Sequence, residues 1–401
     1  MSERDAIYAF VAAFAVAAVL TPLTGRLARA VGVVDRPRDR GLAKRETPLL
    51  GGLAMLAAVL VASLIFLSPS DLTSHRIHGI LLGAVVITIV GALDDRFDLH
   101  PALKLAGEFA AAIIPVHAGV EVHNITLPFL GAVNFGGLGE PLTVLGLVAV
   151  MNVVNFSDGI DGLAAGVCAI AATVFCVIAF DLDRAHAGIL AAVTAGAALG
   201  FLIHNFYPAS VFMGDAGSLL LGLLLGCIAV EGAVKTQAVL ALMFPLVVLA
   251  VPFLDTTFVV LKRMKYGRPV YRADANHFHH RFSRIGFSQR RTVLYLYAWT
   301  VSLGAFAVSL RFVPYSDNHG HFHAGWTAVM AAVGLVVLAG SFYLVYVLEI
   351  LKFRRLDAMR VRRARPDASP DEVDRDVERD FETGEFEAVA GETGEFPIVK
   401  P

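Results

Sequence analysis

The stretch NVVNFSDGIDGLAAGVCAIAATVFCVIAFD, residues 152–181, contains the two features that decide the fold and the kind of site. Its second part, residues 163–181, is a nearly uninterrupted apolar run, and a helix needs roughly 17 to 25 such residues to cross a bilayer. In its first part, amides and carboxylates recur at every third position, namely Asn152, Asn155, Asp158 and Asp161. On a helix this spacing forms one polar ridge. Such a ridge suits a nucleoside, a sugar or metal-bound water, and the alternative is a ridge that only packs helices.

The composition of the whole chain extends the apolar pattern. Of 401 residues, 56% are hydrophobic and 17% are charged, and the mean hydropathy is +0.66. These values exclude an ordinary soluble domain. We therefore predict an all-α fold, a polytopic integral membrane protein with about eleven transmembrane helices. The predicted spans lie near residues 6–22, 49–68, 77–93, 102–117, 142–156, 163–181, 187–203, 217–231, 237–260, 292–312 and 325–351.

Lysine and arginine concentrate in two segments, residues 26–45 after the first predicted span and residues 262–291 after the ninth. Because such residues accumulate in cytoplasmic loops, both segments are predicted to be cytoplasmic. An odd number of spans then places the N-terminus outside and the C-terminus inside. With this orientation, all of the polar clusters described here fall on the cytoplasmic face.

The chain divides into a transmembrane domain, residues 1–351, and a tail, residues 352–401, that is first basic and then acidic. The acidic part cannot bury enough apolar surface to fold alone, so we predict a disordered cytoplasmic tail. It repeats Glu-Thr-Gly-Glu-Phe at residues 382–386 and 392–396. The repeat is either a docking or phosphorylation element or sequence drift in a solvated tail.

Two adjacent carboxylates, Asp94 and Asp95, close the third predicted span, where a cytoplasmic helix end usually carries lysine or arginine. Adjacent side chains on a helix point about 100° apart, so one carboxylate can bind a hard cation while the other meets a second ligand. The alternative is a solvated loop. Lys104, near the start of the next span, either reaches a lipid phosphate or simply extends its ammonium group to water.

The connection between the seventh and eighth spans contains Asn205 and Asp215 and has no lysine or arginine. Asp215 lies between glycines just before an apolar run, which predicts a helix N-cap, a ligand of a divalent metal, or both. Magnesium prefers oxygen ligands from one or two carboxylates together with substrate phosphates. Asp215 with Asp94 or Asp95 is therefore the predicted metal set.

Histidines gather in the most basic segment, in Asn-His-Phe-His-His-Arg at residues 276–281. Such a cluster binds a transition metal or phosphate, or is a solvated loop. Since the basic neighbours would repel a cation, phosphate binding is favoured for His277, His279 and His280.

Two further signals are weaker when taken alone. Asp255 lies inside the apolar run before the histidine segment, and a carboxylate at that depth needs a partner, for which Arg263 is a candidate. Lys44 and Thr47 precede the second span, together with two glycines, in an arrangement that is common at the start of a span.

Together these clusters closely resemble the polyprenyl-phosphate N-acetylhexosamine-1-phosphate transferases, the glycosyltransferase 4 family of integral membrane enzymes. The resemblance covers about residues 1–350, and five motifs occur in the order and spacing of that family. They are KRETPLLGG at 44–52, LDD at 93–95, NFSDGIDGL at 155–163, NFYPASVFMGDAGS at 205–218 and HFHH at 277–280. Any one motif can arise by chance, whereas all five in order are specific.

The resemblance implies transfer of a sugar 1-phosphate from a UDP-sugar to polyprenyl phosphate, with Mg2+ (or Mn2+ as a substitute) and release of UMP. It also implies a site on the cytoplasmic face of a bacterial inner membrane. By this analogy the catalytic residues are Asp94, Asp95, Asp158, Asp161 and His279, and the metal ligands are Asp95 and Asp215. The implied substrate-binding residues are Lys44, Thr47, Lys104, Asn152, Asn155, Asn205, Asp255, His277, His280 and Arg281. The implied partners are a UDP-N-acetylhexosamine, polyprenyl phosphate and the lipid bilayer; homodimerisation is left open, and no nucleic acid is expected.

The family has two main branches that differ in the donor. One takes UDP-N-acetylmuramoyl-pentapeptide, and the other takes UDP-N-acetylglucosamine or a close relative and transfers it to undecaprenyl or decaprenyl phosphate. The eleven predicted spans, the tail and the His-x-His-His-Arg pattern resemble the second branch, whereas the first typically has ten spans and a Pro-x-His-His-His form. Asn276 and His277 therefore count against the first branch.

A membrane transporter is the alternative from another class of protein. Transporters place their polar sites near the bilayer midplane, whereas here the polar groups collect at one predicted face of the membrane. The sequence therefore favours an enzyme over a transporter.

Overall fold

The computed structural model describes residues 2–35, 46–67, 74–127, 131–233, 289–314 and 323–346, with the single residues 70, 369, 372 and 375. The fold is all-α, as predicted. In chain order the helices are α1 (Glu3–Ala30), α2 (Gly51–Phe66), α4 (His75–Phe97), α5 (Pro101–His117), α6 (Gly139–Ser157), α7 (Leu163–Asp181), α8 (Ala185–Asn205), α9 (Gly214–Ala233), α13 (Gln289–Phe312) and α14 (Ala324–Tyr346).

Short strands and one 3-10 turn complete the described elements. Strands β1 (Val34–Asp35) and β2 (Thr47–Pro48) pair antiparallel between α1 and α2. Strands β3 (Asn124–Leu127) and β4 (Gly131–Asn134) form a hairpin between α5 and α6, followed by the 3-10 turn η1 (Gly136–Leu138). These elements connect helices and form no sheet core.

Eight of the described helices are long and apolar enough to cross a membrane, and α2 is a shorter apolar helix. The protein is therefore a multi-pass membrane protein. Ten of the eleven predicted spans coincide with a helix, although α2 and α5 do not meet the length and hydropathy of a full span. The ninth, residues 237–260, lies outside the described residues. The number eleven thus stays a prediction.

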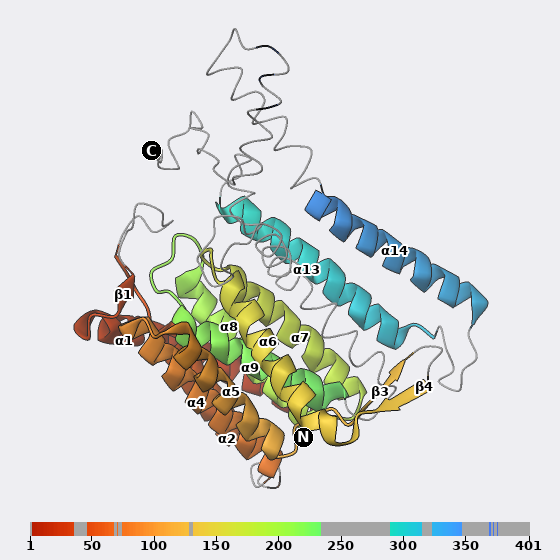
Figure 1. Ribbon diagram of the computed structural model, residues 1–401, viewed down its shortest axis with the longest axis horizontal. Helices are drawn as coiled ribbons and strands as arrows, with labels where there is room; N and C mark the ends of the chain where they lie inside the picture. The colour runs from red at the N-terminus through yellow and green to blue at the C-terminus, as the bar shows by residue number, and fades with distance from the viewer. Residues whose placement is uncertain are drawn as a thin grey trace.

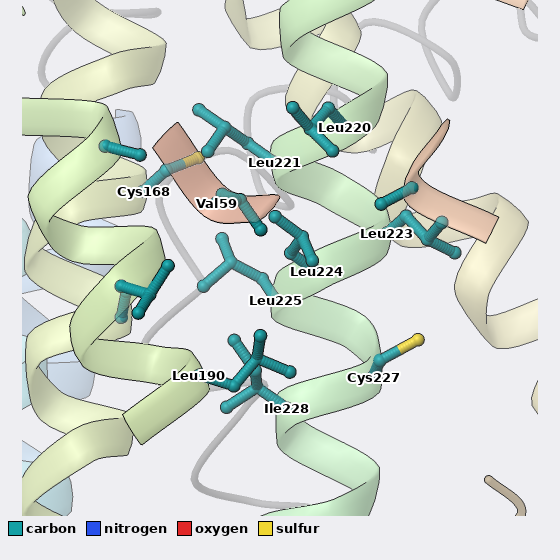
Figure 2. Close-up of a cluster of buried hydrophobic side chains, with 14 of the residues drawn as sticks. Val59, Cys168, Leu190, Leu220, Leu221, Leu223, Leu224, Leu225, Cys227 and Ile228 are labelled. Carbon is teal, nitrogen blue, oxygen red and sulfur yellow. The ribbon is translucent and has the colours of Figure 1, made fainter. Parts of the chain in front are cut away.

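Helix α9 is the centre of the bundle. It packs against α4, α6, α2, α7 and α8, while α1 packs on α8 and α2. Helix α13 lies along α7, and α14 lies beyond α13 on that side of the bundle (Figure 1). Helix α9 is apolar all round, as expected for a helix surrounded by others. In Figure 2 its side chains Leu221, Leu224 and Leu225 lie on the side of Val59 of α2, Cys168 of α7 and Leu190 of α8, whereas Leu223 lies on the other side of α9, and all of these side chains are buried.

Glycines bring the start of α9 unusually close to α2 and α4. A β-carbon added at Gly52 of α2 would overlap the backbone of Gly217, and one added at Gly91 of α4 would overlap the backbone of Ala216. Small residues of this kind allow the backbones of membrane helices to approach closely. The first turn of α9 is therefore held directly against the C-terminal part of α4, which carries Asp94 and Asp95.

The opposite end of the bundle has its own charged contacts, which the sequence did not reveal. The buried carboxylate of Glu231, late in α9, pairs with Arg76 of α4 at 3.3 Å and with His186 of α8 at 3.1 Å. Asp181 of α7 pairs with Arg311 of α13 at the same end. None of these residues belongs to the motifs singled out in the sequence, so no local pattern marks them. They tie neighbouring helices together at the end away from Asp94.

Candidate active site

Asp95 caps helix α9 from a distant part of the chain. Its Oδ1 accepts a hydrogen bond from the backbone N–H of Asp215 at 2.8 Å, and its Oδ2 accepts one from Ala216 at 3.2 Å. Gly214 precedes them at φ +68°, and a β-carbon there would overlap the Asp95 carboxylate. The prediction that Asp215 is the N-cap is therefore wrong. Asp215 lies inside the first turn, and the capping oxygens come from α4, because the free N–H groups at a helix start can donate to any well-placed acceptor.

Lys104 joins two carboxylates in the same cluster. Its ammonium group is 3.0 Å from Asp94 Oδ2 and also pairs with Asp215. The other oxygen of Asp94 accepts the backbone N–H of Leu99 at 2.8 Å, which fixes the connection between α4 and α5. Two carboxyl groups, from Asp94 and Asp215, thus flank one ammonium group, and a third, from Asp95, binds the backbone N–H of Asp215. A cluster of this composition favours a further positive charge.

Asn155 connects α6 to the cluster. Its Nδ2 donates to Asp215 Oδ1 at 2.7 Å and to Ser218 Oγ at 2.9 Å. One turn earlier, the amide of Asn152 donates to the carboxylate of Glu108 and to the Val148 carbonyl, the latter at 3.0 Å. Both asparagines therefore face α5 and α9, as one face of a helix requires.

Glu108 is a site residue that sequence reasoning missed. It is only 1% exposed, on α5, and receives the Asn152 hydrogen bond. The available signal was its position four residues after Lys104, which places both side chains on one face of the helix. Because this buried carboxylate accepts a hydrogen bond from Asn152, Glu108 helps to fix the position of α6.

The polar ridge predicted over Asn152 to Asp161 is wrong in its second half. Helix α6 ends at Ser157, so Asp158 and Asp161 lie in the connection to α7. Gly162 adopts φ +82° at the end of this connection, a conformation that suits glycine, and α7 starts directly after it. The two asparagines therefore project from a helix and the two aspartates from a loop.

Asp158 and Asp161 differ in their partners. Asp161 Oδ2 accepts the backbone N–H of Ala209 at 2.9 Å. Within the described residues, the Asp158 carboxyl has no hydrogen-bond or ion-pair partner. Burial, and then the charges of Asp215 and Asp95, raise the pKa of Asp158 to about 8. Burial also raises the pKa of Asp161. The carboxyl group of Asp158 is thus available to bind a ligand beside the cluster.

Asn205 holds two loops together. Its Oδ1 accepts the N–H of Gly162 at 2.9 Å, and its Nδ2 donates to the Val211 carbonyl at 3.1 Å. The residue is 2% exposed. Its amide is therefore engaged with backbone groups, and direct contact with a substrate stays a prediction.

The connection before α2 meets the connection before α9. Phe212 donates its N–H to the Pro48 carbonyl at 2.8 Å, and Gly51 donates to the Phe212 carbonyl at 3.1 Å. Thr47 is buried beside this junction. The described part of the first motif, residues 46–52, thus contacts the motif at 205–218, which leads into the start of α9.

Several predicted site residues lie outside the described residues: Lys44, Asp255, His277, His279, His280 and Arg281. Their roles stay predictions. In the described part of the chain, no group of three or more histidine, cysteine, aspartate or glutamate side chains is arranged to hold a metal ion. The oxygen chemistry of Asp94 and Asp215 nevertheless fits magnesium, which uses one or two carboxylates plus substrate phosphates, and these two groups already share the positive charge of Lys104.

Comparison with known proteins places the chain among membrane transferases. The family model for glycosyl transferase family 4 matches residues 77–233. A probable undecaprenyl-phosphate N-acetylglucosaminyl 1-phosphate transferase of Bacillus subtilis is 34% identical over 292 residues, 73% of this chain and 81% of the relative. A decaprenyl-phosphate N-acetylglucosaminephosphotransferase of Mycobacterium leprae is 38% identical over 314 residues, 71% of this chain and 79% of the relative. A phospho-N-acetylmuramoyl-pentapeptide-transferase of Desulforudis audaxviator is 35% identical over 326 residues, 74% and 93% respectively.

Proposed function

The chain belongs to glycosyl transferase family 4, and from this we propose that it transfers N-acetylglucosamine 1-phosphate from UDP-N-acetylglucosamine to a polyprenyl phosphate and releases UMP. The acceptor is undecaprenyl or decaprenyl phosphate, the lipids in the names of the Bacillus and Mycobacterium relatives. The observation that carries the proposal is the convergence of Asp94, Lys104, Asn155 and Asp215 at one end of an apolar helix bundle. Such a site suits two phosphorylated substrates, one of which is anchored in lipid.

The donor distinguishes this proposal from a second candidate, transfer of phospho-N-acetylmuramoyl-pentapeptide. A relative with that activity in its name is 35% identical, so overall identity alone does not separate the branches. The Asn276-His277 pair, in place of the proline form of that branch, supports N-acetylglucosamine. A transporter is not supported, since the relatives compared above are named as transferases.

For the chemical step we propose a single displacement at the β-phosphorus of the donor by an oxygen of the lipid phosphate. The second pKa of a phosphate monoester is near ~6, so the acceptor is largely dianionic at neutral pH and needs no general base. Catalysis then depends on positioning and on charge neutralisation, as in phosphoryl transfer generally. Lys104 is suited to hold an acceptor phosphate, because it offers an ammonium group next to the end of α4.

A covalent aspartyl-phosphate intermediate is the rival mechanism. It requires two successive displacements and therefore retains the configuration at phosphorus, whereas a single displacement inverts it. A donor with a chiral β-phosphate separates the two mechanisms, and retention of configuration would overturn the single displacement.

We further propose that Asp215, with Asp94 or Asp95, holds Mg2+, for which Mn2+ can substitute. When bound, the ion neutralises negative charge on the donor diphosphate. Both oxygens of Asp95 bind backbone N–H groups of α9, whereas one oxygen of Asp94 and one of Asp215 bind the side-chain ammonium group of Lys104, whose place a metal ion can take. This difference favours Asp94 as the partner of Asp215 and leaves Asp95 to hold the start of α9.

On the donor side, we propose that Asn155, Asp158 and Asp161 line the nucleotide-sugar site. Burial raises the pKa of Asp158, which favours the protonated form of its carboxyl group. A protonated carboxyl donates a hydrogen bond, so Asp158 can bind a carbonyl or phosphate oxygen of the donor without adding negative charge. The histidines of residues 277–280 are proposed to contact phosphate in the same site.

The proposed location is a bacterial inner membrane with the site and C-terminus on the cytoplasmic side and the N-terminus outside. The distribution of lysine and arginine supports this orientation. UDP-sugars are made in the cytoplasm, so the donor then reaches the site directly.

A donor competition with the purified protein in detergent tests the function. UMP release is followed with polyprenyl phosphate, Mg2+ and either UDP-N-acetylglucosamine or UDP-N-acetylmuramoyl-pentapeptide. Turnover of the first alone is expected, and turnover of the second alone would assign the protein to the other branch. The matched control is Asp215→Asn, which keeps the size of the side chain and should abolish turnover while the protein stays folded.

A further inference from the structure

Tyr297, on α13, holds the loop that carries Asp158 and Asp161. Its hydroxyl donates to the carbonyl of Gly162, the residue that follows Asp161. The N–H of Gly162 is held from another direction by Asn205 at 2.9 Å. Side chains from α8 and α13 thus fix the two backbone polar groups of the glycine at which this loop becomes helix α7.

The Tyr297 hydrogen bond is not required to satisfy the Gly162 carbonyl. That oxygen already accepts the N–H of Gly166 at 3.0 Å, in the first turn of α7. A carbonyl has two lone pairs, so the hydroxyl supplies a second bond. Removing the hydroxyl therefore leaves no unpaired backbone group, and its contribution concerns where the loop lies more than whether the helix forms.

Helix α7, against which Tyr297 packs, leaves space for the tyrosine ring because residue 166 is a glycine. Gly166 faces the tyrosine, and a β-carbon at Gly166 would overlap the ring and its hydroxyl. The side chain of Tyr297 is half-buried as a result. The close approach of α13 to the start of α7 thus depends on a glycine, which makes it a specific contact.

Helix α13 also contacts the connection between α8 and α9, residues 206–213, which lies beside the site. Arg290 Nε donates to the Tyr207 carbonyl at 3.2 Å, and its guanidinium lies 5.9 Å from the centre of the Tyr207 ring. Two residues further on, Ala209 donates its N–H to Asp161. One helix therefore reaches Asp161 by two routes, through Gly162 and through the loop after α8.

We propose that Tyr297 is a positioning residue for the donor side of the site, which holds the Asp158–Asp161 loop in the geometry that binds the nucleotide-sugar. The inference rests on the proposed function, because it assigns this loop to the donor. The inference also separates the two substrates. The loop is held by α8 and α13, whereas Lys104 and Asp94 on the acceptor side form no hydrogen bond or ion pair with Tyr297 in the described structure.

The test is Tyr297→Phe, which removes only the hydroxyl. KM is measured for UDP-N-acetylglucosamine and for polyprenyl phosphate separately, and deuterium uptake is measured for peptides covering residues 158–166. Loss of one hydrogen bond of ordinary strength should raise the donor KM by about 3- to 10-fold with the acceptor KM unchanged. Deuterium uptake in the 158–166 peptides should rise.

The matched control is Trp299→Phe on the same helix. It removes the hydrogen bond from Trp299 Nε1 to Ser341 of α14, at 3.0 Å, and leaves the loop contact in place. This variant should change neither the donor KM nor uptake in 158–166. Equal changes in both variants, equal changes in both KM values, or unchanged uptake in Tyr297→Phe would overturn the proposal. If the wild-type protein does not use UDP-N-acetylglucosamine, the proposed function fails, and deuterium uptake still decides whether Tyr297 holds the loop.

Discussion

The carboxylate of Asp95 accepts the backbone N–H of Asp215 at 2.8 Å, across 120 positions of the chain. This contact couples the end of α4 to the start of α9 and sets the position of a second carboxylate of the cluster. Asp95 therefore stabilises the fold in addition to any role in the reaction, because its two oxygens accept N–H groups at the start of α9 that have no acceptor within the helix.

Asp95→Ala should therefore lose stability as well as activity. Loss of a capping carboxylate costs about 0.5–2 kcal/mol, and Asp95→Asn, which keeps one accepting oxygen, should lose less. Thermal unfolding in detergent and UMP release measure the two effects. Equal stability of Asp95→Ala and wild type would contradict the capping role.

Removal of the Lys104 ammonium should harm use of the lipid acceptor. Lys104→Met leaves Asp94 and Asp215 without their shared cation, and we expect turnover to fall on the order of 100-fold, comparable to loss of one charge-stabilising group in other enzymes. Lys104→Arg keeps the charge and should retain part of the activity. Steady-state kinetics at varied polyprenyl phosphate provide the measurement, and a Met variant as active as the Arg variant would show that the charge is dispensable.

The stability of the protein should depend on pH through Asp158. Its pKa is raised from 3.8 to about 8 in the folded protein, so between these values the folded state keeps a proton that the unfolded state has lost. Stability from this group therefore falls as pH rises from about 4 to about 8. Asp158→Asn removes the dependence, so its Tm relative to wild type should be higher at pH 8 than at pH 5, by on the order of a few degrees. An identical Tm difference at both pH values would contradict the assignment.

Glu108 should support the site through Asn152. Glu108→Leu leaves the half-buried Asn152 amide with the Val148 carbonyl as its acceptor. Loss of one hydrogen bond of ordinary strength costs about 0.5–1.5 kcal/mol, and it should lower activity by freeing the face of α6 that carries Asn155. Glu108→Gln keeps an accepting oxygen and should stay close to wild type. Chemical unfolding and UMP release compare the pair; if the Gln variant is as impaired as the Leu variant, the charge of Glu108 matters more than its hydrogen bond.

The sequence predicted the fold class well because a bilayer imposes a single requirement, a long apolar helix, on each span. Asp94, Asp95 and Asp215 were found for the same reason, since carboxylates stand out in an apolar chain. The capping of α9 by Asp95 was not predictable, because it depends on the close approach of Gly91 to Ala216 in three dimensions.

The wrong prediction of a continuous polar ridge and the failure to single out Tyr297 also have local causes. The ridge from Asn152 to Asp161 was expected to continue as helix, and spacing alone could not show that α6 ends at Ser157. Tyr297 is one aromatic residue among several in an apolar helix, so only its contact with Gly162 distinguishes it.

The burial of α9 has a consequence for biosynthesis. The helices that pack against it, α2, α4, α6, α7 and α8, all precede it in the chain. During synthesis from the N-terminus, the helices that surround α9 can therefore pack together before α9 leaves the ribosome. Domains generally fold in this order, with the N-terminal part first. Asp215 is then the last carboxylate of the cluster to be synthesised, and a nascent chain that stops before it contains Asp94, Asp95 and Lys104 but lacks the residue that contacts both Asp95 and Lys104.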